Sequence, residues 1–154
     1  YAHTRGFAFV LFEGPDSPFD WGVKDIRGQQ KNLRILDEIT KLIERYQPEV
    51  FVIEDTGVRT TRRISRIRKL YHMLARLAEA QCIELHRYSK ADVRECFESV
   101  GASTKYEIAK VIAVQIPVFA HRLPRYRKAW MSEDPRQSLF DAAALVLVKF
   151  YVSE

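Results

Sequence analysis

The stretch VFVIEDTG, residues 50–57, sets four apolar residues directly before two carboxylates. A continuous apolar run of this kind is typical of a strand that is covered on both faces, as strands of parallel sheets are. Glu54 and Asp55 then bring negative charge to the carboxyl end of that strand. Removing a carboxylate from water without a partner costs on the order of several kcal/mol, so these acids need a compensating role.

The segments on either side of this strand predict one α/β domain. Hydrophobic periodicity, Gly and Pro divide the chain into a strand hairpin, a helix, the strand above, a long helix, a further strand and three helices. Their expected ranges are 7–12 with 19–26, 29–48, 50–53, the residues after Gly57 to about Ala80, 82–88, 89–101, 103–117 and 137–151. Residues 118–136 are rich in Pro and Arg and predict a loop. No repeat or linker interrupts this order, so residues 1–154 are expected to form a single domain. Its mixed sheet would have antiparallel strands first and parallel strands after, with helices on both faces.

Two of the predicted helices carry capping residues that fix where they begin. Ser89 precedes Asp92 by three residues, and Thr104 precedes Glu107 by the same spacing. In such a pair the hydroxyl accepts a backbone N–H of the first turn, so we expect helices to start directly after Ser89 and Thr104.

The composition, with 47% hydrophobic and 29% charged residues, is that of an ordinary globular protein rather than a disordered chain. The apolar runs are far shorter than the roughly 20 residues that cross a bilayer, and no export signal is recognised, so no membrane association is expected. Cys82 and Cys96 lack metal-binding spacing and lie among apolar neighbours, which favours buried thiols in a reducing compartment. We therefore expect a cytoplasmic protein.

The positive charge of the chain, +5 in total, is unevenly distributed. The run RTTRRISRIRK at residues 59–69 holds six cations and no anion. On a helix its arginines recur at intervals of three and four residues and so share one face. A solvated helix face normally mixes both signs, whereas like charges this close repel unless a polyanion is present. We therefore favour binding to a nucleic-acid backbone over a merely solvated face. The predicted contacts are Arg59, Arg62, Arg63, Arg66 and Lys69.

Asp141 raises the same question as Glu54, because it lies in an otherwise apolar segment, SLFDAAALVL. Two ordinary explanations are open: Glu54 is the first solvated residue after its strand, and Asp141 serves the start of its helix. A third follows from the order of elements, since ligand sites of open α/β sheets gather at the carboxyl ends of strands. A terminal helix that crosses the sheet would bring the two acids together, and a shared Mg²⁺ or Mn²⁺ would remove their repulsion. With arginines nearby, this arrangement suits phosphodiester hydrolysis.

The sequence resembles RuvC-type Holliday junction resolvases and their YqgF-like relatives, within the RNase H-like superfamily. The resemblance rests on the order of elements and on three motifs, FVIE at 51–54, GASTK at 101–105 and FDAAALVL at 140–147. It implies a mixed five-stranded sheet of the RNase H type. It also implies a metal-dependent endonuclease that acts on branched DNA in recombination and repair, as a homodimer. By the same resemblance Glu54 and Asp141 would bind two divalent metal ions, Mg²⁺ or Mn²⁺, and Lys105 would lie near the scissile phosphate.

The sequence departs from this family at two positions. The family's first metal-binding Asp would fall about two residues before Tyr1, and the sequence also lacks the central strand that should carry it. We therefore expect these 154 residues to be a portion of a longer polypeptide. Ser138 stands where resolvases often have a further Asp, and Asp134 in the preceding loop is the alternative acid.

Two alternatives to a DNA nuclease stay open. A domain that has lost catalysis would keep the fold and the basic face, and would bind nucleic acid without cutting it. A YqgF-like protein would cleave structured RNA instead. The residues encoded before Tyr1 distinguish the first alternative from the enzyme, and a comparison of RNA with four-way DNA junctions distinguishes the second.

Overall fold

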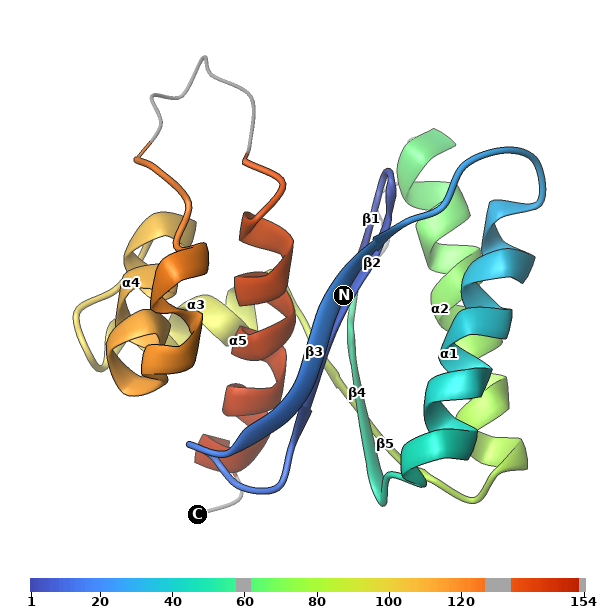
Figure 1. Cartoon of the computed structure of the whole chain (residues 1–154), viewed down its shortest axis with the longest axis horizontal. Coiled ribbons are helices and arrows are strands. Elements are labelled where there is room, and N and C mark those ends of the chain that lie inside the picture. Colours follow the sequence, from blue (N-terminus) through green and yellow to red (C-terminus); the bar gives the residue numbers. More distant parts are fainter. Residues whose placement is uncertain (58–61, 127–133, 153–154) are drawn as a thin grey trace.

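The computed structural model describes residues 1–57, 62–126 and 134–152, with the side chains of residues 62–64 excepted (Figure 1). The elements are β1 (Ala2–His3), β2 (Gly6–Phe12), β3 (Pro18–Asp25), α1 (Lys31–Tyr46), β4 (Val50–Glu54), α2 (Arg62–Ala80), β5 (Glu84–Tyr88), α3 (Lys90–Glu98), α4 (Lys105–Gln115), the 3-10 helix η1 (Pro117–Arg122) and α5 (Gln137–Val152). This order matches the one that the sequence predicts, with two additions, the short β1 and η1. Helix η1 occupies the start of the predicted loop, because Phe119 is fully buried and anchors this segment to the core.

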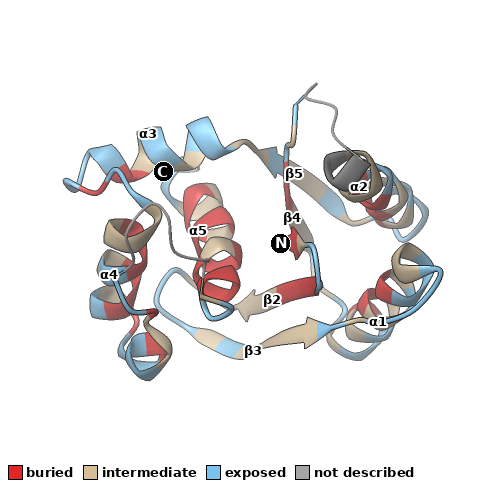
Figure 2. Ribbon diagram, turned by 90° about the horizontal axis from the view of Figure 1, so that it is seen from above, coloured by how far each residue is buried: buried red, intermediate tan, exposed pale blue. Residues whose placement is uncertain are grey.

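The described strands form two sheets rather than one five-stranded sheet. In the first, β2 pairs antiparallel with both β1 and β3; in the second, β4 and β5 are parallel. The expectation of antiparallel strands first and parallel strands after is therefore confirmed. No backbone ladder joins β2 to β4 among the described strands, and Figure 2 shows these two ribbons standing apart.

Helices cover both faces of the strands, as predicted. Helices α1 and α2 lie side by side on one face, while α5 lies on the other with α3 and α4 outside it (Figures 1 and 2). A hydrophobic core forms on each side. The first packs α5 against α4 and η1 and includes Phe119 and Phe140. The second packs α1 and α2 against β2 and β4 and includes Ile35, Ile53 and Leu70.

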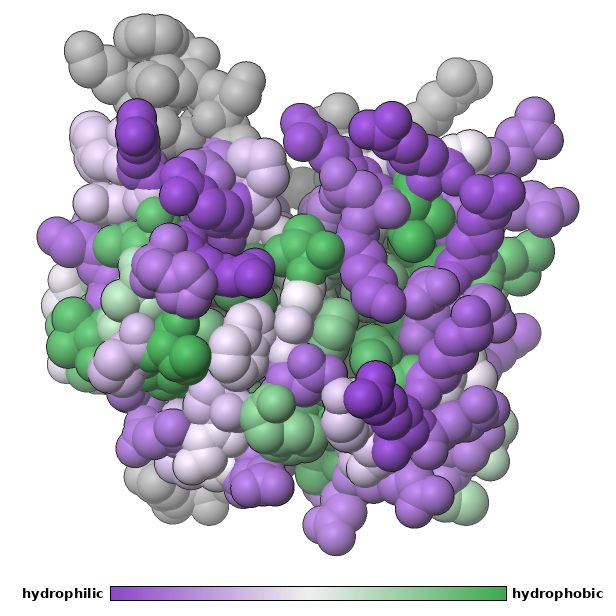
Figure 3. Space-filling model, in the orientation of Figure 1, coloured by the Kyte–Doolittle hydropathy of each residue, from purple (hydrophilic) through white to green (hydrophobic). Residues whose placement is uncertain are grey.

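Helix α1 shows how the apolar pattern selects the buried face. Ile35, Ile39 and Ile43 recur every four residues and are all buried, because side chains at this spacing lie on one side of a helix. The helix ends at Tyr46, shortly before Pro48, which cannot continue it. The outer surfaces of α1 and α2 are covered by hydrophilic residues, which colour the right half of Figure 3.

Helix α5 packs against both sheets and against two other helices. It contacts β2, β3, β4, β5, α3 and α4. Most of its residues up to Val148 are buried, as expected of a helix that is apolar nearly all round. Among the described residues, no helix is both long enough and apolar enough to pass through a membrane.

The prediction that both cysteines are buried is wrong for Cys82. Both thiols are free, but Cys82 is exposed and Cys96 is half-buried. The chain turns between α2 and β5 at Cys82, where φ is 56°, and the neighbouring Ile83 packs against the second core instead. Apolar neighbours in sequence therefore do not bury a residue that lies in a turn.

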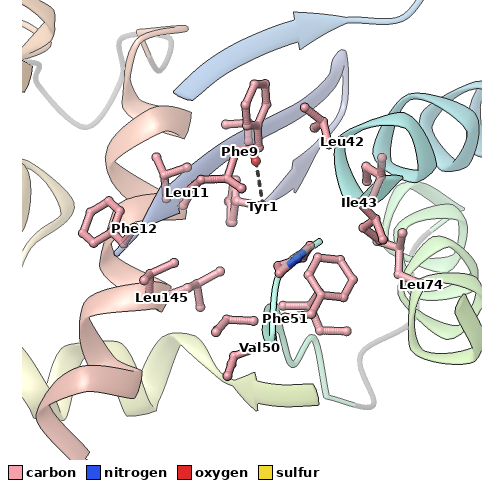
Figure 4. Close-up of a pocket in the computed structure, with 18 of the residues that line it drawn as sticks. Tyr1, Phe9, Leu11, Phe12, Leu42, Ile43, Val50, Phe51, Leu74 and Leu145 are labelled. Carbon is pink, nitrogen blue, oxygen red and sulfur yellow. Dashed lines mark hydrogen bonds between the residues drawn. The ribbon is translucent and has the colours of Figure 1, made fainter. Parts of the chain in front are cut away.

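A large apolar cavity lies between β2 and β4 (Figure 4). Its volume is about 520 Å³, and α1, α2 and α5 complete its walls. Phe9 and Leu11 line it from β2, Val50 and Phe51 from β4, and Leu145 from α5.

Replacing Leu147 by alanine tests the role of α5. Leu147 is fully buried, so Leu147→Ala is expected to lower the free energy of unfolding by about 2–5 kcal/mol, the range for leucine-to-alanine changes in cores. Because α5 packs on both sheets, we expect one cooperative urea transition at a lower midpoint. Val114→Ala is the control, since Val114 is 82% exposed, and should change the free energy by less than about 0.5 kcal/mol. Two separate transitions, or equal effects of the two changes, would contradict this role.

Candidate active site

Glu54 ends β4 and is buried, with 7% of its surface exposed. The hydroxyl of Tyr71 donates a long hydrogen bond to its carboxylate, at 3.4 Å. The same hydroxyl accepts the backbone N–H of Ala2 at 2.8 Å. Helix α2 and β1 therefore hold the Glu54 side chain at the end of its strand. The ordinary explanation, that Glu54 is a solvated residue past the strand, does not fit this burial.

Asp141 lies in the second turn of α5, and its side chain is 12% exposed. The ammonium nitrogen of Lys105 lies 3.3 Å from one carboxylate oxygen of Asp141. The side-chain amide of Gln137 donates to the other oxygen at 3.1 Å. Because Asp141 is past the first turn and is held by two side chains, stabilisation of the helix start does not explain its place.

Glu54 and Asp141 line the same small pocket, whose volume is about 100 Å³. The terminal helix thus crosses the strands near the carboxyl end of β4, and its acid faces the acid of that strand. The other polar or charged residues of the pocket come from three further segments of the chain; they are Tyr1, Lys90, Arg94, Ser103 and Lys105.

Lys90 and Lys105 reach the pocket because capping residues fix where their helices begin. Ser89 accepts the N–H of Asp92 at 3.1 Å, and Asp92 accepts the N–H of Ser89 at 2.8 Å, so that α3 begins at Lys90. Thr104 accepts a backbone N–H of the first turn of α4 at 3.2 Å, so that α4 begins at Lys105. Both predicted caps are confirmed. They give the two ammonium groups defined starting points beside the acids.

Burial is the main influence on the charges in this pocket. It raises the pKa of Glu54; the nearby charge of Asp141 adds to this, whereas the cations, Lys90 above all, oppose it. The pocket therefore disfavours any charge that is not matched by one of opposite sign.

The hydroxyl of Tyr71 is a stable donor to Glu54. Burial raises the pKa of Tyr71 well above its usual value, and the negative charge of Glu54 raises it further. The phenol therefore keeps its proton at neutral pH. This fixes the direction of the hydrogen bond, from Tyr71 to the carboxylate.

The carboxylate oxygens in this pocket suit a hard divalent cation such as Mg²⁺. Such an ion is bound by carboxylate oxygens, often by one or two carboxylates together with water and substrate phosphates. Glu54 and Asp141 supply oxygens of this kind. Within the described part of the chain, no group of three or more His, Cys, Asp and Glu side chains is close enough to hold a metal ion. With two carboxylates from the protein, water and substrate phosphates would supply the remaining ligands of the ion. The expectation of two ions stays a prediction.

The further acid named in the sequence analysis, Asp134, lies in a wider cleft of about 810 Å³ beside the pocket. The guanidinium of Arg136 donates to its two oxygens at 3.0 and 2.6 Å and holds the pKa of Asp134 below its usual value. Ser138 is buried, and its hydroxyl donates to the carbonyl of Pro135 at 3.1 Å. Asp134 is thus already paired with a cation of its own loop.

The predicted nucleic-acid contacts lie on α2 and just before it, and the structure describes a part of them. Arg59 and the side chains of Arg62 and Arg63 lie outside the described residues. Lys69 is exposed on α2. The role of these residues in binding stays a prediction.

Arg66 has a structural partner on each of two neighbouring elements. Its guanidinium donates to the side-chain oxygen of Asn32 at 2.8 Å and to the carbonyl of His3 at 3.2 Å. It therefore ties α2 to α1 and to β1, next to the strand end that carries the acid. A contact of Arg66 with nucleic acid would come in addition to these bonds.

Three residues of the site were missed in the sequence analysis: Tyr71, Lys90 and Gln137. Tyr71 lies among the apolar positions of α2 and resembled an ordinary packing residue. Lys90 directly follows a capping serine, so the cap itself was the available signal. Gln137 precedes Asp141 by four residues, a spacing that brings side chains together on a helix.

The arrangement of strands and helices is that of a RuvC-like fold, and solved structures confirm this resemblance. One is T. thermophilus RuvC in complex with a Holliday junction substrate, with a TM-score of 0.66 and 16% identity over 93% of this chain and 84% of that chain. Another is a Thermus thermophilus RuvC structure, with a TM-score of 0.65 and 18% identity over 94% of this chain and 86% of that chain. No protein-family model and no curated protein matches the sequence. At identities this low, the structural likeness establishes the fold alone.

Replacing Glu54 by glutamine is expected to stabilise the metal-free protein at neutral pH. Because burial raises the pKa of Glu54 above its usual value of 4.5, the carboxyl costs stability once the pH exceeds that value, and the cost grows until the folded-state pKa is passed. The melting temperatures of Glu54→Gln and the parent should be similar at pH 4 and diverge toward pH 7. The difference should be about 2–4 °C for each kcal/mol of change in the free energy of unfolding.

Thermal melting in the presence of a chelator measures this difference. Glu95→Gln, at an exposed position of α3, is the matched control and should show no growing difference. A Glu54→Gln variant that loses stability relative to the parent as the pH rises would contradict the account of the buried charge.

Proposed function

We propose that this chain is a nuclease domain of the RuvC kind, which hydrolyses phosphodiester bonds of branched DNA with the help of divalent metal ions. The observation that carries the proposal is that buried Glu54 and half-buried Asp141 line one pocket together with Lys90 and Lys105. The RuvC-like fold supports it, since one of the similar solved structures is a complex with a Holliday junction substrate.

The charges of the pocket suit a phosphodiester. A phosphate group would be repelled by the two carboxylates alone, and a cation held between Glu54 and Asp141 would reverse this repulsion. The ammonium of Lys105 is 3.3 Å from Asp141, so it is close enough to bind either the carboxylate or a phosphate oxygen beside it. Lys90 would add a second positive charge at the same place.

Divalent ions, two Mg²⁺ or Mn²⁺ by resemblance, would supply an activated water and stabilise the departing oxygen. Glu54 and Asp141 would hold these ions, and Tyr71 would keep the Glu54 carboxylate in one orientation. The further acid that the resemblance places two residues before Tyr1 would face the same side as Tyr1, because side chains alternate along a strand. Tyr1 lines this pocket, so that acid would point toward it.

The basic residues of α2 would hold the DNA backbone next to the pocket. Contacts of this kind position the substrate and do not read its bases. We propose a homodimer, as the resemblance implies, because a second copy would present a second pocket to the other half of a symmetric junction.

A domain that binds nucleic acid without cutting it is the second candidate. It is favoured by the finding that two acids, not three, meet within the described residues. A strand that ends in Asp directly before Tyr1 in the encoded polypeptide would favour the enzyme, and a strand without it would favour the binder.

In Mg²⁺ the protein is expected to cut a labelled four-way DNA junction. Glu54→Gln and Asp141→Asn should each reduce the cleavage rate by roughly 10²- to 10³-fold, the range for loss of one electrostatic stabiliser of a transition state. Junction binding, measured by gel shift in chelator, should stay within about threefold, because phosphate contacts supply most of the affinity. Glu95→Gln is the control for both measurements.

The same assay separates the candidates. A Glu54→Gln variant that cuts at the parent rate would refute the role of this acid. A parent that binds the junction without cutting it would support the binding domain, and cleavage of structured RNA in place of the junction would identify an RNA nuclease.

Lys69→Ala tests the basic face through its salt dependence. Each lost phosphate contact should make the slope of log affinity against log salt concentration less steep by about 0.9. Lys41→Ala is the matched control, since Lys41 is exposed on α1 and paired with Asp37 at 3.3 Å. Equal slopes for the two variants would remove Lys69 from the binding surface.

A further inference from the structure

A pair of tyrosines lies on the surface near the candidate active site, one on α4 and one on the segment that follows η1. The ring centroids of Tyr106 and Tyr126 are 5.4 Å apart, and the rings are nearly perpendicular, at 76°. Tyr106 is half-buried, whereas 70% of the surface of Tyr126 is exposed. A tyrosine that serves the core buries its ring, as Tyr71 does. Packing of the core therefore does not account for the place of Tyr126.

The chain directly before Tyr126 is anchored to the domain. Leu123 packs against the first core, and Pro124 is buried. The pKa of Asp134 is lowered first by the guanidinium of Arg136 and also by the backbone N–H of Arg125, which therefore faces this carboxylate. The exposed ring of Tyr126 is thus presented from a fixed stem.

The charged side chains around the tyrosine pair are basic. The ammonium of Lys110 lies over the ring of Tyr106, 5.6 Å from its centroid, which is within the range of a cation–π contact. Arg125 is exposed next to Tyr126, and Arg122 is half-buried at the end of η1. Within the described part of the chain, none of these three cations forms an ion pair with a carboxylate. Their charge is therefore available to an anion from outside the protein.

A second aromatic pair has a similar geometry and different charges. The rings of Phe19 and Tyr46 are 5.6 Å apart at 69°, and Arg45 lies over Tyr46. The hydroxyl of Tyr46 donates to the carboxylate of Asp20, so a negative charge lies directly at this pair. A polyanion would meet repulsion at Phe19 that it does not meet at Tyr126.

An exposed aromatic ring among cations is the arrangement by which proteins bind single strands of nucleic acid. The cations attract the phosphates, and the aromatic ring stacks on a base. A base inside a duplex is already stacked on its neighbours, so a protein ring reaches the face of a base most easily where the strand is unpaired. The chemistry of this surface therefore fits an unpaired nucleotide.

The tyrosine pair lies close to the pocket that holds the acids. Tyr106 directly follows Lys105, which lines that pocket together with Tyr1. In Figures 1 and 2, α4 and α2 lie on opposite sides of the N-terminus of the chain. The tyrosine pair and the basic face of α2 are therefore on opposite sides of the acids. A strand that is held on α2 and crosses the pocket would continue toward Tyr126.

We propose that Tyr126, supported by Tyr106, is a stacking site for one unpaired base of a nucleic-acid strand. Arg125 and Lys110 bind the phosphates of the same strand. Because every base has an aromatic face, the site accepts any base. It requires a nucleic-acid ligand, as the proposed function does, but it requires no cleavage.

Two labelled single strands of about a dozen nucleotides test this site, a length within the site sizes of such proteins. One strand is made of thymidines, and the other has the same backbone without bases. Fluorescence anisotropy in chelator measures their binding without cleavage. Tyr126→Ala should weaken binding of the thymidine strand by about 5- to 150-fold, the range for loss of one base–aromatic stack. Tyr126→Trp should bind it as the parent does. On the strand without bases, Tyr126→Ala and the parent should bind alike.

Salt dependence separates the ring from the charges. Tyr126→Ala should leave the slope of log affinity against log salt concentration unchanged, since tyrosine carries no charge. Arg125→Ala should make the slope less steep by about 0.7, the value for one contact with a single strand. Phe19→Ala is the matched control, because it removes the exposed member of the other aromatic pair, and it should bind as the parent does. Because Tyr126 is exposed, Tyr126→Ala should keep the melting temperature of the parent.

Three results would each overturn the proposal. They are a parent that does not bind the thymidine strand, a Tyr126→Ala variant that binds it as tightly as the parent, and an equal loss of affinity on the strand without bases. Cleavage of a junction is measured separately and does not enter these readouts. The stacking site and the proposed nuclease activity can therefore fail independently.

Discussion

The packing of α5 against both sheets is the constraint on which the rest of the structure depends. No backbone ladder connects β2 with β4 among the described strands, so side chains must hold the two sheets in register. The cavity between them measures about 520 Å³, so the two sheets make little direct contact there. Helix α5 contacts strands of both sheets and so joins them, and it also carries Asp141.

The candidate site depends on the same helix crossing. Glu54 is held by Tyr71 from one side of the strands, and Asp141 is held by Lys105 and Gln137 from the other. The two acids come from elements that meet because α5 packs across the end of β4. A small displacement of α5 would separate them and would open the core at the same time. Stability and site geometry are thus set by one set of contacts.

Much of the fold could be predicted from sequence, because its signals are local. The apolar run before Glu54, the capping serine and threonine, and the apolar final helix each determine an element by themselves. The division into two sheets could not be predicted, since strand pairing depends on partners far apart in sequence. Tyr71 was missed for a related reason: its ring packs like any core residue, and only the tertiary fold shows that its hydroxyl reaches Glu54. The turn at Cys82 likewise overrode its apolar neighbours.

Helices α3 and α4 both begin at the pocket that holds the acids, with Lys90 and Lys105 as their first residues. The peptide dipoles of a helix add up to a partial positive charge at this end, which normally disfavours a cation there. Each lysine is therefore held where its own helix repels it. An anion that enters the pocket meets two ammonium groups and two helix ends, and these offset the repulsion that it meets from Glu54 and Asp141.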